Sequence, residues 1–130
     1  MRRVPMTAAL ALIAAMRASV AEGAAVDVRI DHNATVVDGG AAVVVSVRAR
    51  CPIGLELLEG IVTVNQGGSE GEGSFGVPCD GRPRRATATV LAIDFLFEPG
   101  EAISSSLLLV VDPNTDETLE AQDSRVIKVR

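Results

Sequence analysis

The sequence predicts an all-β fold, a small antiparallel immunoglobulin-like β-sandwich of about seven strands with one disulfide. Apolar residues alternate with polar ones at a period of two in several short runs, and turn residues separate these runs. Two cysteines extend such runs, and no run has the period of an amphipathic helix. A small closed β-barrel is the alternative, because it is built from the same short strands.

The first two expected strands show the alternation most clearly. Residues 26–30 alternate valine or isoleucine with charged residues. An Asp-Gly-Gly turn at 38–40 separates them from the second run, 42–51. In that run a row of every second residue, beginning at Val43, is apolar and ends at Cys51. Both runs therefore have one face suited to a core.

Five further strands are expected along the rest of the chain. Each run is enriched in Val, Ile, Thr, Leu or Phe, and Asp-Gly and Pro-Gly pairs supply turns between them. The runs cover residues 60–66, 75–79, 84–97, 102–111 and 125–130.

Cys51 and Cys79 are the two cysteines of the chain, and each continues the inward-facing row of its own expected strand. An even number of cysteines in a small exported domain predicts a disulfide, and this spacing fits no Cys-x-x-Cys metal motif. A bridge closing a loop of roughly 28 residues contributes about 3–4 kcal/mol in the chain-entropy model.

Residues 1–21 are expected to be a secretory signal peptide, and 22–130 a single β-sandwich domain. The segment has a basic start, an apolar run over 6–16 and small residues ending at Ala21, where a signal peptidase would cleave. Arg17 interrupts a run already shorter than the roughly 20 apolar residues of a spanning helix, so no stable membrane insertion of the mature chain is expected. The mature protein is thus predicted to be secreted and extracellular.

Removal of residues 1–21 leaves nine basic and 17 acidic residues, a formal charge of −8. Such a chain repels polyphosphates, so no nucleic-acid partner is expected. The aromatic content of 2% leaves few rings for stacking on sugars or bases. With one His, the chain also cannot support chemistry that needs two imidazoles.

The segment 67–76 matches two short motifs without the context that either needs. Residues 67–71 read Gly-x-Ser-x-Gly, the nucleophile elbow of hydrolases, and residues 71–76 read Gly-x-Gly-x-x-Gly, a dinucleotide fingerprint. Both motifs require a following helix, and here a strand pattern follows. The segment is expected to be a flexible Gly-rich loop between strands.

The leading prediction for function is a non-enzymatic secreted module that binds an extracellular protein or a small ligand through its loops or a sheet face. The sequence offers neither a base–nucleophile pair nor a cluster of His and Cys. One alternative is a carrier of a small apolar ligand, with a cleft lined by residues such as Leu91, Phe95 and Leu96.

A second alternative is a carboxylate-dependent hydrolase, in which Glu56, Glu59 and Asp94 form the acid–base set. This alternative requires two of these carboxylates to face each other across a pocket.

Calcium is the one cofactor hypothesis. Oxygen-bearing residues recur in 112–123 at a spacing close to that of a calcium loop, in which hard oxygen ligands surround one ion. The expected ligands are Asp112, Asn114, Asp116 and Asp123. The alternative is a polar hairpin loop whose acidic residues keep it solvated.

Five features follow one another along the chain. They are a signal peptide, a strand ending in Cys51-Pro52, a Gly-rich segment, Cys79-Asp80-Gly81 and a Pro-Gly turn at 99–100. In this order the chain resembles small secreted actinobacterial β-sandwich proteins of unknown function, over roughly residues 25–111. The resemblance implies a disulfide-stapled β-sandwich outside the cell and carries over no catalytic residues. The use of 11 Arg and one Lys also suggests a GC-rich bacterial genome.

Overall fold

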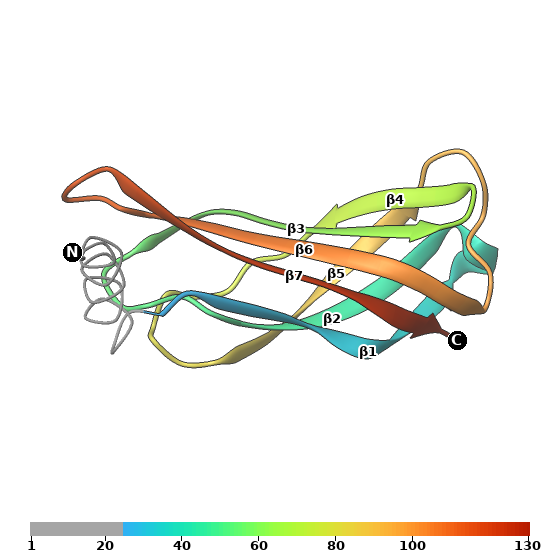
Figure 1. Ribbon diagram of the computed structural model, residues 1–130, viewed down its shortest axis with the longest axis horizontal. Coiled ribbons are helices and arrows are strands. Elements are labelled where there is room, and N and C mark those ends of the chain that lie inside the picture. The colour runs from blue at the N-terminus through green and yellow to red at the C-terminus, as the bar shows by residue number, and fades with distance from the viewer. Residues whose placement is uncertain (1–24) are drawn as a thin grey trace, which may run out of the picture.

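The computed structural model describes residues 25–130, and the expected signal peptide at 1–21 lies outside the described residues. Seven strands and one short 3-10 turn make up the regular structure of this part of the chain (Figure 1). In order they are β1 (Asp27–Val37), η1 (Asp38–Gly40), β2 (Ala42–Arg50), β3 (Glu56–Gln66), β4 (Ser69–Ser74), β5 (Arg84–Ala92), β6 (Gly100–Asp112) and β7 (Glu117–Val129).

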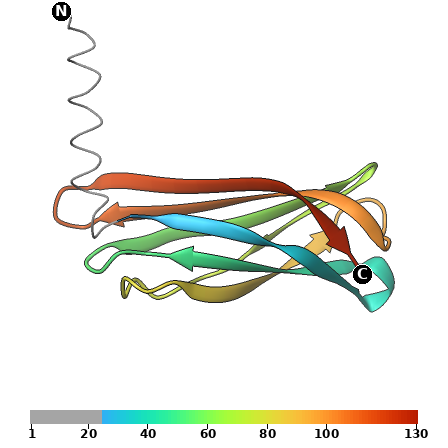
Figure 2. The same ribbon diagram turned by 60° about the horizontal axis from the view of Figure 1, so that its bottom comes forward.

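The strands close into an elongated barrel in the order β1-β2-β5-β4-β3-β6-β7 (Figure 2). Neighbouring strands are antiparallel except β1 and β7, which are parallel. The prediction of an all-β fold of seven strands is confirmed, and the closure corresponds to the barrel alternative. The sandwich description is compatible with it, because β1–β7 and β4–β5 are each joined by only two residue pairs.

The core is lined by the alternating residues that the sequence pattern predicts. The row that runs from Val43 of β2 to Cys51, just after the strand, is fully buried, and β5 contributes Ala88 and Val90 opposite it. Leu108 and Val110 of β6 complete the opposite layer. Period-two alternation therefore sets which side chains face inward, as a barrel of this size requires.

The Gly-rich segment 67–76 is not the flexible loop that was expected, because Ser69–Ser74 form strand β4. A Cβ atom at Gly71 would collide with the carbonyl oxygen of Leu91, and one at Gly73 with that of Thr89. Glycine at these two positions allows the backbones of β4 and β5 to approach closely. The run 75–79 is correspondingly not a strand, and Phe75 instead packs in the core.

Other strand boundaries differ from expectation as well: β1 continues to Val37 instead of ending at residue 30, and β3 begins at Glu56 instead of residue 60. The expected strand 84–97 ends at Ala92, and the residues after it cross the end of the barrel. The last strand is much longer than 125–130, since β7 pairs with β6 along the whole length from Glu117 to Val129. Residues 117–124 are mostly polar, and an apolar face is present over only part of the strand. The alternation there was therefore too weak to predict a strand.

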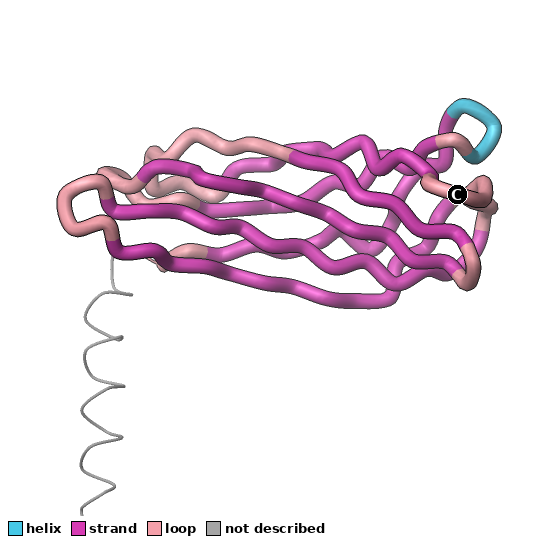
Figure 3. Tube along the Cα trace, turned by 90° about the horizontal axis from the view of Figure 1, so that it is seen from above, coloured by secondary structure: helices cyan, strands magenta, loops and turns pink. Residues whose placement is uncertain are grey.

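The predicted disulfide between Cys51 and Cys79 is present. It ties the end of β2 to the loop 75–83, and the N–H of Gly81 also donates a hydrogen bond of 2.9 Å to the carbonyl of Cys51. Loops gather at the two ends of the barrel (Figure 3). We name the end that carries this bridge the disulfide end.

Replacing both cysteines by alanine should lower the free energy of unfolding by about 3–4 kcal/mol, because the loop of 28 residues is then unconstrained in the unfolded chain. Chemical denaturation of the variant, and of the native chain in its reduced and oxidised forms, measures this difference in the free energy of unfolding. Equal stability of the oxidised and reduced protein would contradict it.

Gly71→Ala should lower the free energy of unfolding by about 2–3 kcal/mol, because β4 must move away from Leu91 to accommodate the new methyl group. Gly76→Ala is the matched control, since a Cβ there meets only a side-chain atom of Leu57 at 3.7 Å. In thermal unfolding, the melting temperature of Gly76→Ala should lie close to that of the native protein. Equal losses of stability in both variants would count against a close β4–β5 contact.

Candidate functional site

A short segment closes the barrel at the end opposite the disulfide. We name residues 93–99, which connect β5 to β6, the strap (Figures 1 and 2). Its backbone is held at three points by hydrogen bonds: Ile93 N–H to Glu70 O at 2.9 Å, Ser69 Oγ to Leu96 O at 2.8 Å, and Phe97 N–H to Gly40 O at 2.8 Å. These partners lie on β4 and η1, so the strap joins the two sides of the barrel end.

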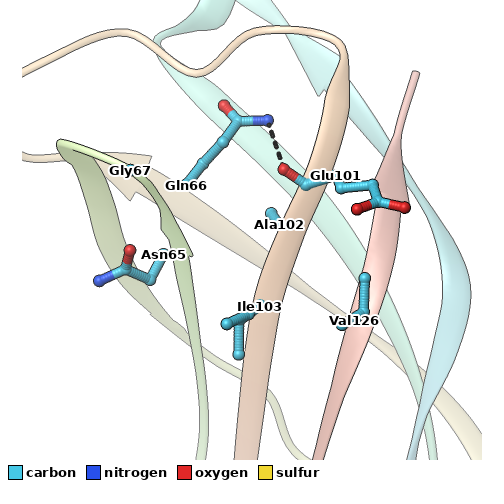
Figure 4. A pocket seen from close by; sticks show the side chains of 7 residues that line it. All are labelled: Asn65, Gln66, Gly67, Glu101, Ala102, Ile103 and Val126. Carbon is cyan, nitrogen blue, oxygen red and sulfur yellow. Dashed lines mark hydrogen bonds between the residues drawn. The ribbon is translucent and has the colours of Figure 1, made fainter.

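Gln66, at the end of β3, fixes the last part of the strap. Its Nε2 donates to the carbonyl of Glu98 at 2.7 Å, and its Oε1 accepts from the N–H of Glu98 at 2.8 Å. The same Nε2 lies 3.3 Å from the carbonyl of Glu101 (Figure 4). One amide side chain thus satisfies both backbone groups of Glu98, which belongs to no sheet ladder, and also reaches the start of β6.

The strap buries one aromatic ring and displays three large apolar side chains. Phe97 is only 2% exposed and packs into the core. Ile93, Phe95 and Leu96 are 66%, 64% and 60% exposed. Exposed apolar side chains gathered on one segment are typical of interaction sites, and a backbone already fixed by hydrogen bonds loses little freedom on binding.

The strap and the segments that flank it in sequence are acidic, while Lys128 of β7 is the register partner of Glu101. Segments 66–74 and 91–103 contain no Lys, Arg or His. They contain five carboxylates, all exposed, at Glu70, Glu72, Asp94, Glu98 and Glu101. The combination of exposed apolar groups with nearby negative charge favours a partner that carries apolar side chains flanked by basic ones.

A shallow depression of about 290 Å³ lies beside the strap, between β3, β6 and β7 (Figure 4). Its lining residues are Asn65, Gln66, Gly67, Glu101, Ala102, Ile103 and Val126. Ile103 and Val126 are direct cross-strand partners, and both are exposed. They form a second, smaller apolar patch on the neighbouring sheet face.

The cleft expected around Leu91, Phe95 and Leu96 is not formed. The structure brings these residues to the same end of the barrel, but all three are exposed and none lines the depression. They project outward because the strap runs over the barrel end with only Phe97 turned inward. This surface suits a protein better than an enclosed apolar ligand.

The expected acid–base set is not brought together either. Glu56 and Glu59 lie near the start of β3, opposite Val111 and Leu109 of β6. Asp94 lies in the strap at the other end of the barrel, near the end of β3. All three carboxylates are exposed, so they lack the shared, desolvated pocket that a pair of catalytic carboxylates needs.

The proposed calcium ligands are also separated. Asp112, Asn114 and Asp116 lie at the β6–β7 turn, where the N–H of Asn114 donates to Oδ1 of Asp112 at 2.9 Å. Asp123 pairs with Ser106 on β6, six residues and therefore roughly 20 Å along the strand from Asp112. The polar hairpin alternative describes this loop, and residues 25–130 hold no group of three His, Cys, Asp or Glu able to bind a metal.

Asp123 instead links two strands at the side of the barrel. Its Oδ2 accepts from the N–H of Ile30 on β1 at 2.8 Å and from Nε of Arg125 at 3.2 Å. Partial burial acts to raise the pKa of this carboxyl, but the hydrogen bonds from Ile30 and Arg125 outweigh it, so the pKa lies below the ordinary value. The charged form of Asp123 therefore stabilises the β1–β7 side.

Sequence reasoning missed the residues that hold the strap. Gln66 and Ser69 flank the Gly67-Gly68 turn, and only the three-dimensional fold places them beside 96–101. A usable signal was the alternation of glycine with Glu70 and Glu72, which has the period of a strand rather than a loop.

The chain matches no family model, no curated protein and no solved structure in the three comparisons made. Within residues 25–130, no helix has the length and apolar character needed to cross a membrane.

Asp123→Asn should lower the free energy of unfolding by about 1 kcal/mol at pH 7, because a charge-assisted hydrogen bond to Ile30 becomes a weaker neutral one. The folded pKa lies below the ordinary value of 3.8. The stabilisation is therefore present above about pH 4 and is lost as the pH falls through the folded pKa.

Denaturation curves at pH 7 and pH 2.5 measure this difference, which should shrink at the lower pH. Asp116→Asn, in the exposed turn, is the matched control and should change stability little at either pH. A pH-independent loss in the Asp123 variant would refute the electrostatic explanation.

Proposed function

We propose that this protein is a secreted, non-enzymatic binding module that holds a partner protein through the strap. The observation that carries the proposal is the display of Ile93, Phe95 and Leu96 on a backbone fixed by hydrogen bonds from Gln66 and Ser69. Apolar anchors held in place before binding supply most of the affinity in protein interfaces.

Secretion is part of the same proposal. The support is the signal-peptide pattern of residues 1–21 and a small domain that carries a disulfide, which is compatible with an extracellular location. A bacterial origin, and kinship with the secreted actinobacterial β-sandwich proteins that the sequence resembles, are proposed on sequence pattern alone.

The surroundings of the strap favour a basic, partly apolar protein segment as the partner. The five nearby carboxylates would attract Lys or Arg side chains, and the exposed ring of Phe95 and the branched chains of Ile93 and Leu96 would contact apolar residues between them. The strap is less suited to binding a small apolar ligand, because such ligands bind where most of their surface is enclosed.

Selection of binders from a displayed random-peptide library tests this function. Peptides retained by the wild-type domain should be enriched in Lys or Arg beside aromatic or aliphatic residues. Phe95→Ser/Leu96→Ser should weaken their binding about 10- to 100-fold, because two apolar contacts of roughly 1.5–3 kcal/mol each are partly lost. Calorimetric titration of individual peptides measures the change.

Ile53→Ser is the matched control, since Ile53 is 76% exposed but lies in the loop next to Cys51 at the disulfide end. This variant should bind the peptides as the wild type does. Selected peptides without basic residues, or equal binding by the strap variant, would overturn the proposal. Melting temperatures close to wild type in both variants would exclude unfolding as the cause.

A further inference from the structure

The basic residues of the chain are concentrated toward the disulfide end, on or just before three neighbouring strands. Six of the nine basic residues that follow residue 21 lie there, at Arg29, Arg48, Arg50, Arg82, Arg84 and Arg85. The strands β1, β2 and β5 are consecutive in the barrel. In a chain whose expected mature charge is −8, this concentration makes one face locally cationic.

Three of these arginines form a row across the outer side of the barrel. Arg29 of β1 is the register partner of Arg48 of β2, which is in turn the register partner of Arg85 of β5. Adjacent strands lie about 4.8 Å apart, so the row places three cationic residues within roughly 10 Å. Arg50 is the next outward residue of β2 and adds a fourth, about 7 Å further along the strand.

The carboxylates of the chain neutralise these arginines only in part. Arg85 forms an ion pair of 2.9 Å with Asp31 of β1, and because β2 lies between β1 and β5, this pair holds the Arg85 guanidinium over β2. Arg29, Arg48 and Arg50 have no carboxylate within 4 Å among residues 25–130, and all three are exposed. Three guanidinium groups can therefore donate hydrogen bonds to the anionic groups of a ligand.

Hydroxyl groups lie beside the row, on the side toward the middle of the barrel. The next outward residues of β2 and β5 are Ser46 and Thr87, which are register partners. The three Phe residues of the chain lie in the core or in the strap, so no aromatic ring accompanies the arginines. We name this surface the arginine face, and its residues are Arg29, Arg48, Arg50, Arg85, Ser46 and Thr87.

We propose that the arginine face binds an acidic polysaccharide, a chain of sugars that carries carboxylate or sulfate groups. Guanidinium donates paired hydrogen bonds to oxyanions such as carboxylate, and the hydroxyls of Ser46 and Thr87 can exchange hydrogen bonds with sugar hydroxyls. Because the row crosses the strands, the polymer would lie across β1, β2 and β5, with its anionic groups over successive strands. Binding through charge and hydrogen bonds needs no stacking ring, so it is compatible with the aromatic content of 2%.

The residues of the arginine face favour this ligand over other polyanions. Single-stranded nucleic acids bind where aromatic side chains stack on the bases, and membrane surfaces bind where apolar side chains enter the lipid beside basic ones. An acidic protein segment would need apolar anchors for most of its affinity. The arginine face has neither rings nor large apolar side chains, whereas its hydroxyl groups suit a ligand that is itself rich in hydroxyls.

The negative net charge of the chain does not prevent this binding. Asp27 and Asp31 of β1 lie beside the arginine face, so its four arginines and these two carboxylates give a local charge of 4 − 2 = +2. Glu72 pairs with Leu91, which lies six residues and roughly 20 Å along β5 from Arg85. That distance exceeds the Debye length of about 8 Å in physiological salt, so the carboxylates near the strap are largely screened from a ligand on the arginine face.

The arginine face shares no residue with the strap. It lies toward the disulfide end of β1, β2 and β5, whereas the strap closes the other end of the barrel. A polysaccharide can therefore bind whether or not the strap holds a partner protein, and the two proposals can fail separately.

Surface plasmon resonance with the mature domain in solution tests the site. The immobilised probes are polygalacturonate, which carries carboxylates, dextran sulfate, and neutral dextran. In about 50 mM salt the domain should bind at least one of the two acidic polymers and should not bind neutral dextran. Which acidic polymer binds distinguishes carboxylate from sulfate recognition. Raising the salt to about 0.5 M should weaken the binding at least about tenfold, because the contacts join exposed charges.

Arg29→Gln/Arg48→Gln should bind the acidic polymer about 5- to 20-fold more weakly, because two charge-assisted contacts are lost at an exposed site. Lys128→Gln/Arg130→Gln is the matched control, since it removes two exposed cations at the end of β7 and gives the same net charge. The control should bind as the wild type does. Asp27→Asn should bind about 2- to 5-fold more tightly, because the carboxylate opposite Arg50 is neutralised.

The gain expected for Asp27→Asn cannot result from a loss of folding, which removes the main ambiguity of weakened binding in the arginine variant. The strap variant Phe95→Ser/Leu96→Ser should bind the polymer like the wild type. Three results would each overturn the proposal: no binding of either acidic polymer by the wild type, equal losses in the arginine variant and its control, or tighter binding of polyphosphate or single-stranded DNA than of the polysaccharides.

Discussion

The close approach of strands β4 and β5 is the constraint on which the rest of the barrel end depends. Gly71 and Gly73 permit it, because any larger residue would meet the carbonyl oxygens of β5. This contact closes the barrel and brings Glu70 to the start of the strap, where its carbonyl accepts from Ile93. The first residue of the strap is then held in place, and Phe97 can turn into the core while Phe95 remains exposed. Without this approach the two layers would form an open sandwich.

Period-two alternation predicted most strands, because it directly reflects one buried and one exposed face. It did not decide between sandwich and barrel. Closure depends on two short joints, the parallel pairing of Asn33 and Ala34 with the end of β7 and the pairing of Gly71 and Glu72 with β5. A joint of only two residue pairs is too short to produce a periodic pattern in the sequence. Glycine is, in addition, usually interpreted as a loop signal, because close packing of two backbones cannot be recognised from sequence.

The site was less predictable than the fold. Phe95 and Phe97 are two positions apart and would share a face in a strand, yet one is exposed and the other buried because the strap is not a strand. The spacing of the acidic residues from Asp112 to Asp123 resembled a calcium loop, but an extended hairpin places them far apart. Residue types alone therefore identified the apolar segment, while its outward display required the hydrogen bonds of Gln66 and Ser69.

A net charge describes this molecule poorly, because its charges are separated along the strands. Arg29, Arg48 and Arg85 are register partners toward the disulfide end, and Glu70 and Glu72 of β4 lie toward the strap. Exposed charges farther apart than a Debye length of about 8 Å are largely screened from one another in physiological salt. The carboxylates beside the strap would therefore act on a partner with little interference from the arginines at the other end of β5.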